Sequence, residues 1–367
     1  MKTWFRRCHL ALALISGLFI LSLSISGALL VFGKEIQLWL QPNNWLISSA
    51  KIHSQQPLAL SELVAKIALV SEQPIHFIER AQSANMVWLV RLGNGDHLNI
   101  NPYNGDIVAQ HQFYDTFYGL VMSWHRWLLL KDQNNNKPLQ ALMACASLLL
   151  MIELVIGCAL WLKAKKPLKR LKIKWRSKAK ALLYQLHTSI GVFCCVPLLL
   201  IAFSGMAFYW QPATQQVVEW LTMSKIQRAI APAPVSTRQQ PLQLDLAYDA
   251  AKSALINAEV YRIYLPNTTN NLLALRLKMP SESHAYSWSW ADPYTGRLLK
   301  SYDASKSSLA TKVWHFKYKF HIGDFFAWPV KLLWLLLSLM PSFLVLSGLY
   351  LYMKRWQKRR IARKHSG

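Results

Sequence analysis

Four runs of apolar residues are each long enough to cross a lipid bilayer, and they exclude an ordinary soluble fold. They lie at about 10–32, 139–162, 187–210 and 326–353. A spanning helix needs roughly 18 to 20 consecutive, mainly apolar residues. A cleaved signal peptide is the alternative for the first run, but this run exceeds the ~7–15 apolar residues of such a peptide. The sequence therefore predicts an α-helical membrane protein with four transmembrane helices, the first of them an anchor.

The net charge of +25 is concentrated beside these runs. Ten Lys and Arg residues and no acidic residue occupy 163–180, seven more follow from Lys354, and three precede the first run. An excess of basic residues in cytoplasmic segments is the usual signature of membrane topology. We therefore expect both termini and the 163–180 loop to be cytoplasmic, and residues 33–138 and 211–325 to lie outside. The same distribution argues against a nucleic-acid partner.

A histidine and a glycine recur at one spacing in two of the runs, which indicates an internal duplication. Gly27 follows His9 by 18 residues, and Gly205 follows His187 by 18. At about 3.6 residues per turn this is five whole turns, so we expect the imidazole and the glycine to share one helix face in both segments. Two such helices bring one histidine each to the same membrane depth. Two histidines placed in this way can hold a haem between them.

Each predicted external region contains an α/β unit of the same order. In the first, the helix-periodic SELVAKIAL precedes the strand MVWLVRL and a hairpin in HLNINPYNGDIVAQ; in the second, PLQLDLAYDAAKSAL precedes NLLALRLKM and AYSWSWADPYTGRLLKSYD. The turns at 101–105 and 292–296 match in chemistry. The chain therefore reads as two copies of one plan.

After each α/β unit, an aromatic segment carries a histidine just before the next apolar run. If the polar residues 132–136 are a five-residue insertion, the 32 residues from His125 to Gly157 match the 27 from His321 to Gly348. His315 is the alternative to His321, because a tryptophan precedes it as one precedes His125. The spacing favours His321.

The topology sorts four histidines into two pairs, His9 with His187 near the cytoplasmic face and His125 with His321 near the external face. Ligation of haem iron by two histidines leaves no open position and suits electron transfer. The alternative is that interfacial histidines only pack beside aromatic side chains. Four of them at symmetric positions favour ligation. The chain has no CxxCH motif, so any haem is non-covalent, and no nucleotide or flavin motif, so electrons come from another molecule.

Other residues carry weaker hypotheses. Glu153 is a carboxylate deep inside a predicted span, which suggests either proton coupling or a packing role. The Trp-rich segment from Tyr286 to Trp290 is read as half-buried sheet, with a platform for a ligand or for the membrane interface as the alternatives. We expect the remaining external histidines to lie at the surface, where one could touch a ferric substrate: His53, His76, His97, His111 and His284.

The chain resembles the PepSY-associated transmembrane family of bacterial inner-membrane proteins, which includes iron-regulated siderophore reductases. The resemblance covers about residues 5–355. It rests on His9 and the run after it, NPYNGDIV, DPYTGRLL, HRWLLL, LHTSIGV and HIGDFFAWPVKLLW.

This resemblance implies a four-helix bundle with periplasmic PepSY units and two b-type haems on His9, His187, His125 and His321. It also implies reduction of a ferric siderophore in the periplasm, with release of Fe(II). The candidate electron donors are a quinol and a flavoprotein. One alternative is a non-catalytic PepSY protein that binds or restrains a periplasmic peptidase. Another is a transporter, which the lack of broken helices and of clustered intramembrane polar residues disfavours.

The predicted organisation is therefore two halves in an inner-membrane, multi-pass protein. Its segments are transmembrane helix 1 (1–32), PepSY-like unit 1 (33–114), an interfacial segment (115–138), transmembrane helix 2 (139–162), a basic cytoplasmic loop (163–183), transmembrane helix 3 (184–210), PepSY-like unit 2 (211–310), a second interfacial segment (311–325), transmembrane helix 4 (326–353) and a basic tail (354–367).

Overall fold

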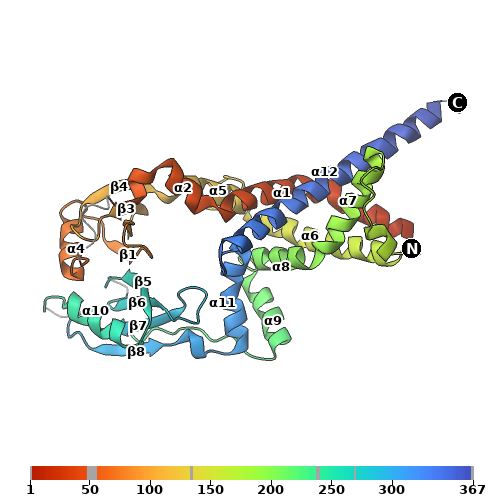
Figure 1. The fold of residues 1–367 in the computed structure, drawn as a ribbon. Helices are drawn as coiled ribbons and strands as arrows, with labels where there is room; N and C mark the ends of the chain where they lie inside the picture. The colour runs from red at the N-terminus through yellow and green to blue at the C-terminus, as the bar shows by residue number, and fades with distance from the viewer. Residues whose placement is uncertain (1, 48–55, 133–134, 237–239, 268–269, 365–367) are drawn as a thin grey trace. The chain divides into compact units, whose positions relative to one another are not determined.

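The computed structural model describes residues 2–47, 56–132, 135–236, 240–267 and 270–364 (Figure 1). The chain forms two compact units. Unit 1 comprises Met1–Gly33, Leu120–Thr214 and Tyr318–Gly367, and unit 2 comprises Lys34–Gly119 and Gln215–Lys317. The chain thus leaves unit 1 twice, and both excursions contribute to the same unit 2.

Unit 1 is built from long apolar helices. Three of them, α1 (Lys2–Val31), α6 (Gln140–Leu162) and α12 (Trp328–Lys364), are long and apolar enough to cross a membrane. Helices α7 (Ala179–Phe193) and α8 (Cys195–Met206) reach that length only together, and they are bent by 62°. Helix α1 packs on α6 and α12, and α6 packs on α8. The described residues therefore hold three candidate spans, or four if the bent pair is one span.

The bend between α7 and α8 corrects the prediction of one straight helix through 187–210. Pro197 is the third residue of α8 and has no N–H to donate to the carbonyl of Phe193, where α7 ends. A proline is one of the usual causes of a sharp kink. The five-turn argument therefore holds along α1 but fails for His187 and Gly205, which lie on opposite sides of the bend.

A second proline, Pro341, lies inside α12 and is accommodated differently. The hydroxyl of Ser24 on α1 accepts a hydrogen bond from the Ser342 N–H at 3.1 Å and donates one to the Ser338 carbonyl. Those two backbone groups are four residues apart and would bond to each other in a regular helix. The Ser24 side chain is thus inserted into the hydrogen-bond ladder of α12 and ties α1 to it.

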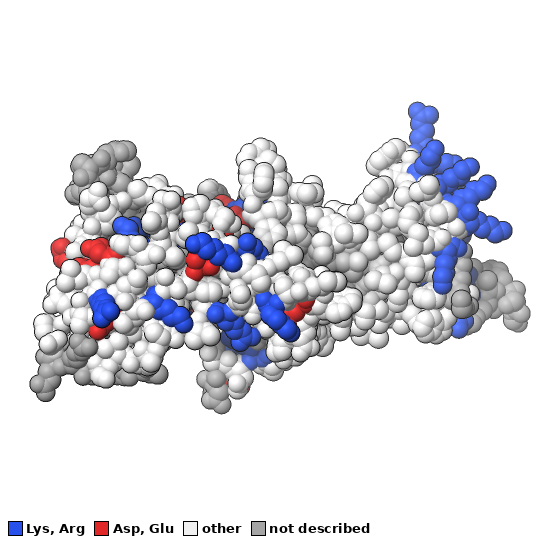
Figure 2. All heavy atoms as spheres, turned by 90° about the horizontal axis from the view of Figure 1, so that it is seen from below, with Lys and Arg blue, Asp and Glu red and all other residues white. Residues whose placement is uncertain are grey.

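Basic side chains gather at one end of unit 1. Figure 2 shows Lys and Arg covering the end at which α12 terminates, without acidic side chains among them. This agrees with the charge pattern on which the topology prediction rests.

Unit 2 contains an eight-stranded antiparallel sheet in the order β4-β3-β2-β1-β5-β6-β7-β8. The first four strands come from the first predicted α/β unit and the other four from the second. Strands β1 and β5 pair with each other, so the two predicted units form one continuous sheet. The strands are β1 (Ile75–Glu79), β2 (Trp88–Leu92), β3 (Asp96–Ile100), β4 (Ile107–Gln112), β5 (Glu259–Tyr264), β6 (Leu273–Lys278), β7 (Ser287–Ala291) and β8 (Leu298–Tyr302).

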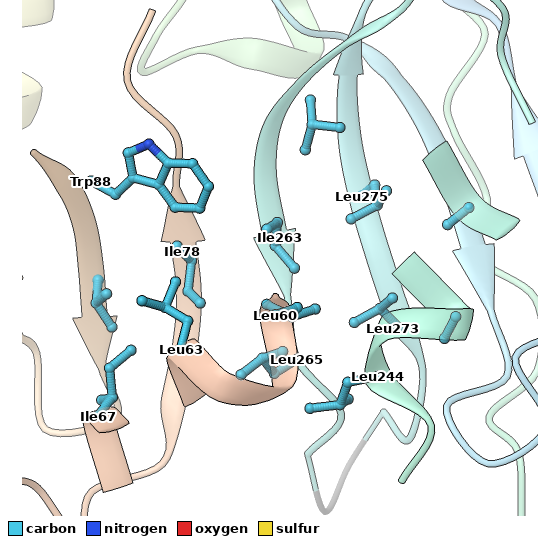
Figure 3. Packing of buried hydrophobic residues seen from close by; sticks show 14 of the residues in the cluster. Leu60, Leu63, Ile67, Ile78, Trp88, Leu244, Ile263, Leu265, Leu273 and Leu275 are labelled. Atoms are coloured by element: carbon cyan, nitrogen blue, oxygen red, sulfur yellow. The ribbon is translucent and has the colours of Figure 1, made fainter. Parts of the chain in front are cut away.

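Helices α4 (Leu60–Ala68) and α10 (Leu244–Ser253) cover one face of this sheet, and a single core lies beneath them. Figure 3 shows Leu60 and Leu63 of α4 beside Ile78 of β1 and Ile263 of β5. The predicted hairpins are also confirmed. Their turns contain Gly105 at φ +77° and Gly296 at φ +70°, a region that favours glycine.

A half-buried ion pair spans the seam between β1 and β5. The Arg262 Nη2 atom lies 2.5 Å from Oε2 of Glu79, and the Tyr261 hydroxyl donates to Oε1 of Glu79 at 3.0 Å. The side chains of Arg262 and Glu79 are only 26% and 21% exposed. Their pairing is therefore screened less by water than an ordinary surface pair.

The remaining helices connect the two units or border the sheet. Helix α5 carries His125, and α11 carries both His315 and His321. Their bounds, with the short 3₁₀ turns, are α2 (Gly33–Leu40), α3 (Pro42–Trp45), η2 (Phe113–Asp115), α5 (Phe117–Trp127), η3 (Leu168–Leu171), α9 (Gln211–Thr222), η4 (Ala304–Lys306) and α11 (Leu309–Ile322).

Candidate functional site

His125 from α5 and His321 from α11 lie next to each other in unit 1. Their ring centroids are 6.2 Å apart and their planes are inclined by 54°. Two imidazoles bound to opposite sides of one metal ion, each at a metal–nitrogen distance of ~2.0 Å, have centroids about 6 Å apart. The spacing of this pair therefore fits axial ligation of one metal by both rings.

Each of these two rings is oriented through its Nδ1 atom. Ser26 Oγ lies 2.9 Å from Nδ1 of His125, and Ser204 Oγ lies 3.0 Å from Nδ1 of His321. The Ile201 carbonyl also lies 3.1 Å from Nδ1 of His321. A carbonyl only accepts, so the tautomer that satisfies this contact carries its proton on Nδ1 and the lone pair on Nε2. Histidines that bind metals are commonly fixed in this way.

A glycine lies behind each ring of this pair. A Cβ atom on Gly27 would be 3.3 Å from Cε1 of His125, and one on Gly205 would be 2.9 Å from Cε1 of His321. Both distances are shorter than ordinary van der Waals contacts. The missing side chains of Gly27 and Gly205 therefore let the two rings lie directly against the backbones of α1 and α8.

The second pair, His9 and His187, repeats this packing. A Cβ atom on Gly157 would lie 3.6 Å from Cε1 of His9, and one on Gly348 would lie 3.5 Å from Cε1 of His187. The pairing of His9 with His187 stays a prediction from the sequence.

The two rings of this second pair are anchored differently. Ser347 Oγ lies 2.7 Å from Nδ1 of His187. His9 lies instead beside the Glu153 backbone. Its buried Nδ1 makes no hydrogen bond of normal geometry within the described part of the chain. His9 is thus the least firmly oriented ring of the four.

One rule describes all four contacts. Each histidine lies against a glycine of another helix and interacts with the backbone of the residue four positions before that glycine. In three cases a serine directly precedes the glycine, although the Ser16-Gly17 pair of α1 meets Val345 and no histidine. The four backbone partners are Leu23, Glu153, Ile201 and Leu344.

The pair formed by His125 and His321 lines an apolar cavity of about 250 Å³ within unit 1. Both Gly27 and Gly205 also line it, and none of its described lining residues is acidic. The volume lies just below the ~300–1,000 Å³ typical of small-molecule pockets. A macrocycle held by both rings would therefore displace some of the lining side chains.

Within the described residues, no group of three or more His, Cys, Asp or Glu side chains is placed to hold a metal ion. A pair of histidines suits a metal whose other ligands come from a macrocycle, as in haem. Haem fits the pair formed by His125 and His321 in three respects: two imidazole donors, Nδ1 atoms held by hydrogen bonds, and glycines that make room for the rings.

The chain matches the family described as the PepSY-associated TM region over residues 6–355. It belongs to this family. The match includes both α/β segments and all four paired histidines. The comparison of the chain with curated proteins gave no match. Membership of the PepSY-associated TM family establishes a membrane protein and leaves its cofactor and substrate to be inferred.

In this PepSY-associated TM protein, His315 takes no part in the histidine pairs. Its ring stacks on Tyr286 in unit 2, with centroids 4.0 Å apart and planes inclined by 9°. Burial, with the charges of Lys317 and Arg276, lowers the pKa of His315 to about 4. The structure brings His321, and not His315, next to His125.

The other singled-out residues lie apart from the paired rings or have partners of their own. Glu153 is 7% exposed and accepts a hydrogen bond from Ser16 Oγ at 2.6 Å. His97 and His111 stack on each other across β3 and β4, with centroids 5.9 Å apart. His53, Gln133 and Asn134 lie outside the described residues.

Proposed function

We propose that this PepSY-associated TM protein is an inner-membrane di-haem b oxidoreductase. It carries electrons across the membrane, reduces a ferric siderophore in the periplasm and releases Fe(II). The observation that carries this proposal is the pair formed by His125 and His321, whose centroids lie 6.2 Å apart with both Nδ1 atoms anchored.

His125 and His321 would hold one haem, and His9 and His187 the other. Haem, when bound, supplies reversible one-electron chemistry. The protein's own residues would orient the ligands. The hydrogen bond between Ser26 Oγ and Nδ1 of His125 leaves Nε2 of this ring available to a metal. The apolar lining of the cavity would lower the local polarity around a bound haem and so influence its reduction potential.

The reaction needs one electron for each Fe(III) that becomes Fe(II). A quinol or a flavoprotein supplies this electron, because the chain carries no nucleotide or flavin motif of its own. Oxygen donors hold the smaller, more highly charged Fe(III) far more tightly than Fe(II), so reduction weakens the chelate and frees the metal. The topology that suits this direction has both termini in the cytoplasm and unit 2 in the periplasm.

The test is the haem content of detergent-purified protein, made in haem-replete cells and measured by the pyridine haemochrome method. We expect two b haems per chain, one fewer in His125→Ala and one fewer in His187→Ala. His111→Ala, which removes a histidine of the sheet, is the matched control and should retain both. A colourless wild-type protein would overturn the proposal and leave binding of a periplasmic peptidase as the leading function.

A further inference from the structure

Unit 2 contains a larger cavity, of about 530 Å³, which plays no part in the histidine pairs. We call it the aromatic cavity. It lies on the face of the sheet opposite α4 and α10. Its walls are formed by β5 to β8, residues 226–231 and the middle of α11, together with His76 of β1 and Gln215 of α9. Its volume is within the ~300–1,000 Å³ of pockets that bind small molecules.

The aromatic lining follows from the alternation of side chains along β7. Ala291 of this strand faces the core beneath α10, and Ser289 points the same way. Trp288 and Trp290 face the cavity, with parallel rings whose centroids are 5.9 Å apart. Tyr264 of β5 lies 5.4 Å from Trp288. The Trp-rich strand is therefore part of the sheet and also presents a platform of flat rings.

The cavity is electropositive as well as aromatic. Arg228 is among its described lining residues, and none of them is acidic. Arg276 lies over the rings of Tyr286 and Trp288, at 5.8 and 6.0 Å from their centroids. Burial lowers the pKa of nearby Lys317 only to about 8, so it remains mostly charged at neutral pH. An anionic ligand is therefore favoured over a cationic one.

Side-chain amides complete the lining. Gln215, Gln227, Asn267 and Asn270 can each donate and accept hydrogen bonds. Flat rings, a positive field and amide groups together match a ligand that is aromatic, anionic and rich in oxygen.

We propose that the aromatic cavity binds the aryl-oxygen groups, catecholate or phenolate, of an anionic ferric chelate. This inference rests on the proposed function, in which the substrate is a ferric siderophore. Electron-rich rings stack on the partly buried Trp288, while Trp290, which is only 3% exposed, packs beside Trp288. The bound oxygens are attracted by Arg228 and Arg276. A neutral hydroxamate chelate has neither the flat ring nor the negative charge, so the cavity discriminates against it.

Helix α11 connects this cavity to the haem ligands along the chain. Trp314 and His315 of α11 line the cavity, and His321 follows His315 by six residues on the same helix. One helix thus contributes, along the chain, both to the wall of the aromatic cavity and to the pair formed by His125 and His321.

The test is calorimetric titration of the purified full chain with the gallium(III) complex of 2,3-dihydroxybenzoate. Gallium(III) is not reduced, so the titration measures binding alone. We expect Trp288→Leu and Arg228→Gln each to weaken binding roughly tenfold, as loss of a central aromatic or arginine contact does. Trp220→Leu and Lys252→Gln are the matched controls, since Trp220 is 76% exposed and both residues lie outside the lining. Gallium(III) acetohydroxamate should bind at least tenfold more weakly than the catecholate complex.

Haem content, measured on every variant, separates the two proposals. A haem-containing protein whose gallium catecholate binding is unchanged by Trp288→Leu and Arg228→Gln would overturn the cavity assignment alone. Equally tight binding of the hydroxamate complex would overturn the ligand class. A protein without haem that still binds the catecholate through these residues would refute the reductase and support the cavity as a binding site.

Discussion

A Cβ atom on Gly205 would lie 2.9 Å from Cε1 of His321, closer than real Cβ atoms approach other atoms. The equivalent distance from Gly157 to His9 is 3.6 Å, an ordinary van der Waals contact. Two glycines that each lie behind a paired histidine thus leave very different amounts of room for a side chain.

This difference predicts opposite outcomes for one substitution. Gly205→Ala should displace the His321 ring from its present position beside His125, and haem content should fall from two per chain towards one. Gly157→Ala should retain both haems, because a methyl group fits beside His9 and alanine favours the helix by about 1 kcal/mol. The pyridine haemochrome assay measures both variants. Loss of haem in Gly157→Ala, or full retention in Gly205→Ala, would contradict this account of the ring contacts.

The Ser24 bridge to α12 should contribute to the stability of unit 1. Ser24→Ala leaves the Ser342 N–H without its partner in an apolar bundle, so we expect a loss of about 1–3 kcal/mol in the free energy of unfolding. A lower midpoint of thermal unfolding in detergent is the measurement. Ser147→Ala is the control, since Ser147 Oγ donates only to Met143 of its own helix at 3.2 Å. An equal loss in both variants would argue against a special role for the bridge.

The Glu79–Arg262 pair should hold the seam of the sheet. Glu79→Ala leaves a largely buried guanidinium without its carboxylate, and we expect β1 and β5 to open more readily by about 1–3 kcal/mol. Hydrogen exchange of the backbone amides of β1 and β5 in the full chain measures this. Glu259→Ala is the control because Glu259 is 76% exposed and lies 4.0 Å from Lys278. Unchanged exchange in Glu79→Ala would show that the backbone pairing alone holds the seam.

His97 should make unit 2 less stable in acid. Burial, and then the charges of His111 and Arg91, lower the pKa of His97 to about 4, despite opposing effects of Glu79 and Asp96. In the unfolded chain the pKa of His97 is about 6.5, so between pH 6.5 and 4 the unfolded state binds a proton that the folded state does not bind. The free energy of unfolding therefore falls as the pH drops from 6.5 towards 4.

The replacement His97→Leu should flatten this dependence. The thermal midpoint of unit 2, followed by tryptophan fluorescence, should fall less between about pH 7.5 and about pH 5 than in the wild type. The measured quantity is the change of the thermal midpoint between the two pH values, because loss of the stacked ring shifts the stability of the variant at every pH. If the thermal midpoint falls by the same amount between these pH values in the wild type and in His97→Leu, the acid sensitivity comes from other groups.

Much of this protein follows from local sequence patterns. Long apolar runs produced α1, α6 and α12, because a helix satisfies its own backbone hydrogen bonds in lipid. Turn residues such as Gly105 and Gly296 placed the hairpins, because few residues adopt a positive φ. The spacing of His125 and His321 from their spans also identified the two rings that the structure brings together.

Strands β1 and β5 were not predicted. They are short, and each lies between two other strands: β1 pairs with β2 and β5, and β5 pairs with β1 and β6. The pairing of β1 with β5 joins residues more than 180 positions apart, as the contact between Glu79 and Arg262 shows. No local pattern contains that information. The sequence shows two copies of one pattern. The pairing of β1 with β5, which joins the two copies into a single sheet, is seen only in the tertiary structure.

The sequence by itself determined which segments are apolar, where the chain turns and which histidines recur. The tertiary structure decided which glycine each histidine meets. His125 lies against Gly27 of α1, and His9 lies against Gly157 of α6. It also decided that Pro197 divides the third apolar run by a 62° bend. The physical reason is that helix and turn formation depend on neighbouring residues, whereas ring contacts depend on how separate helices pack.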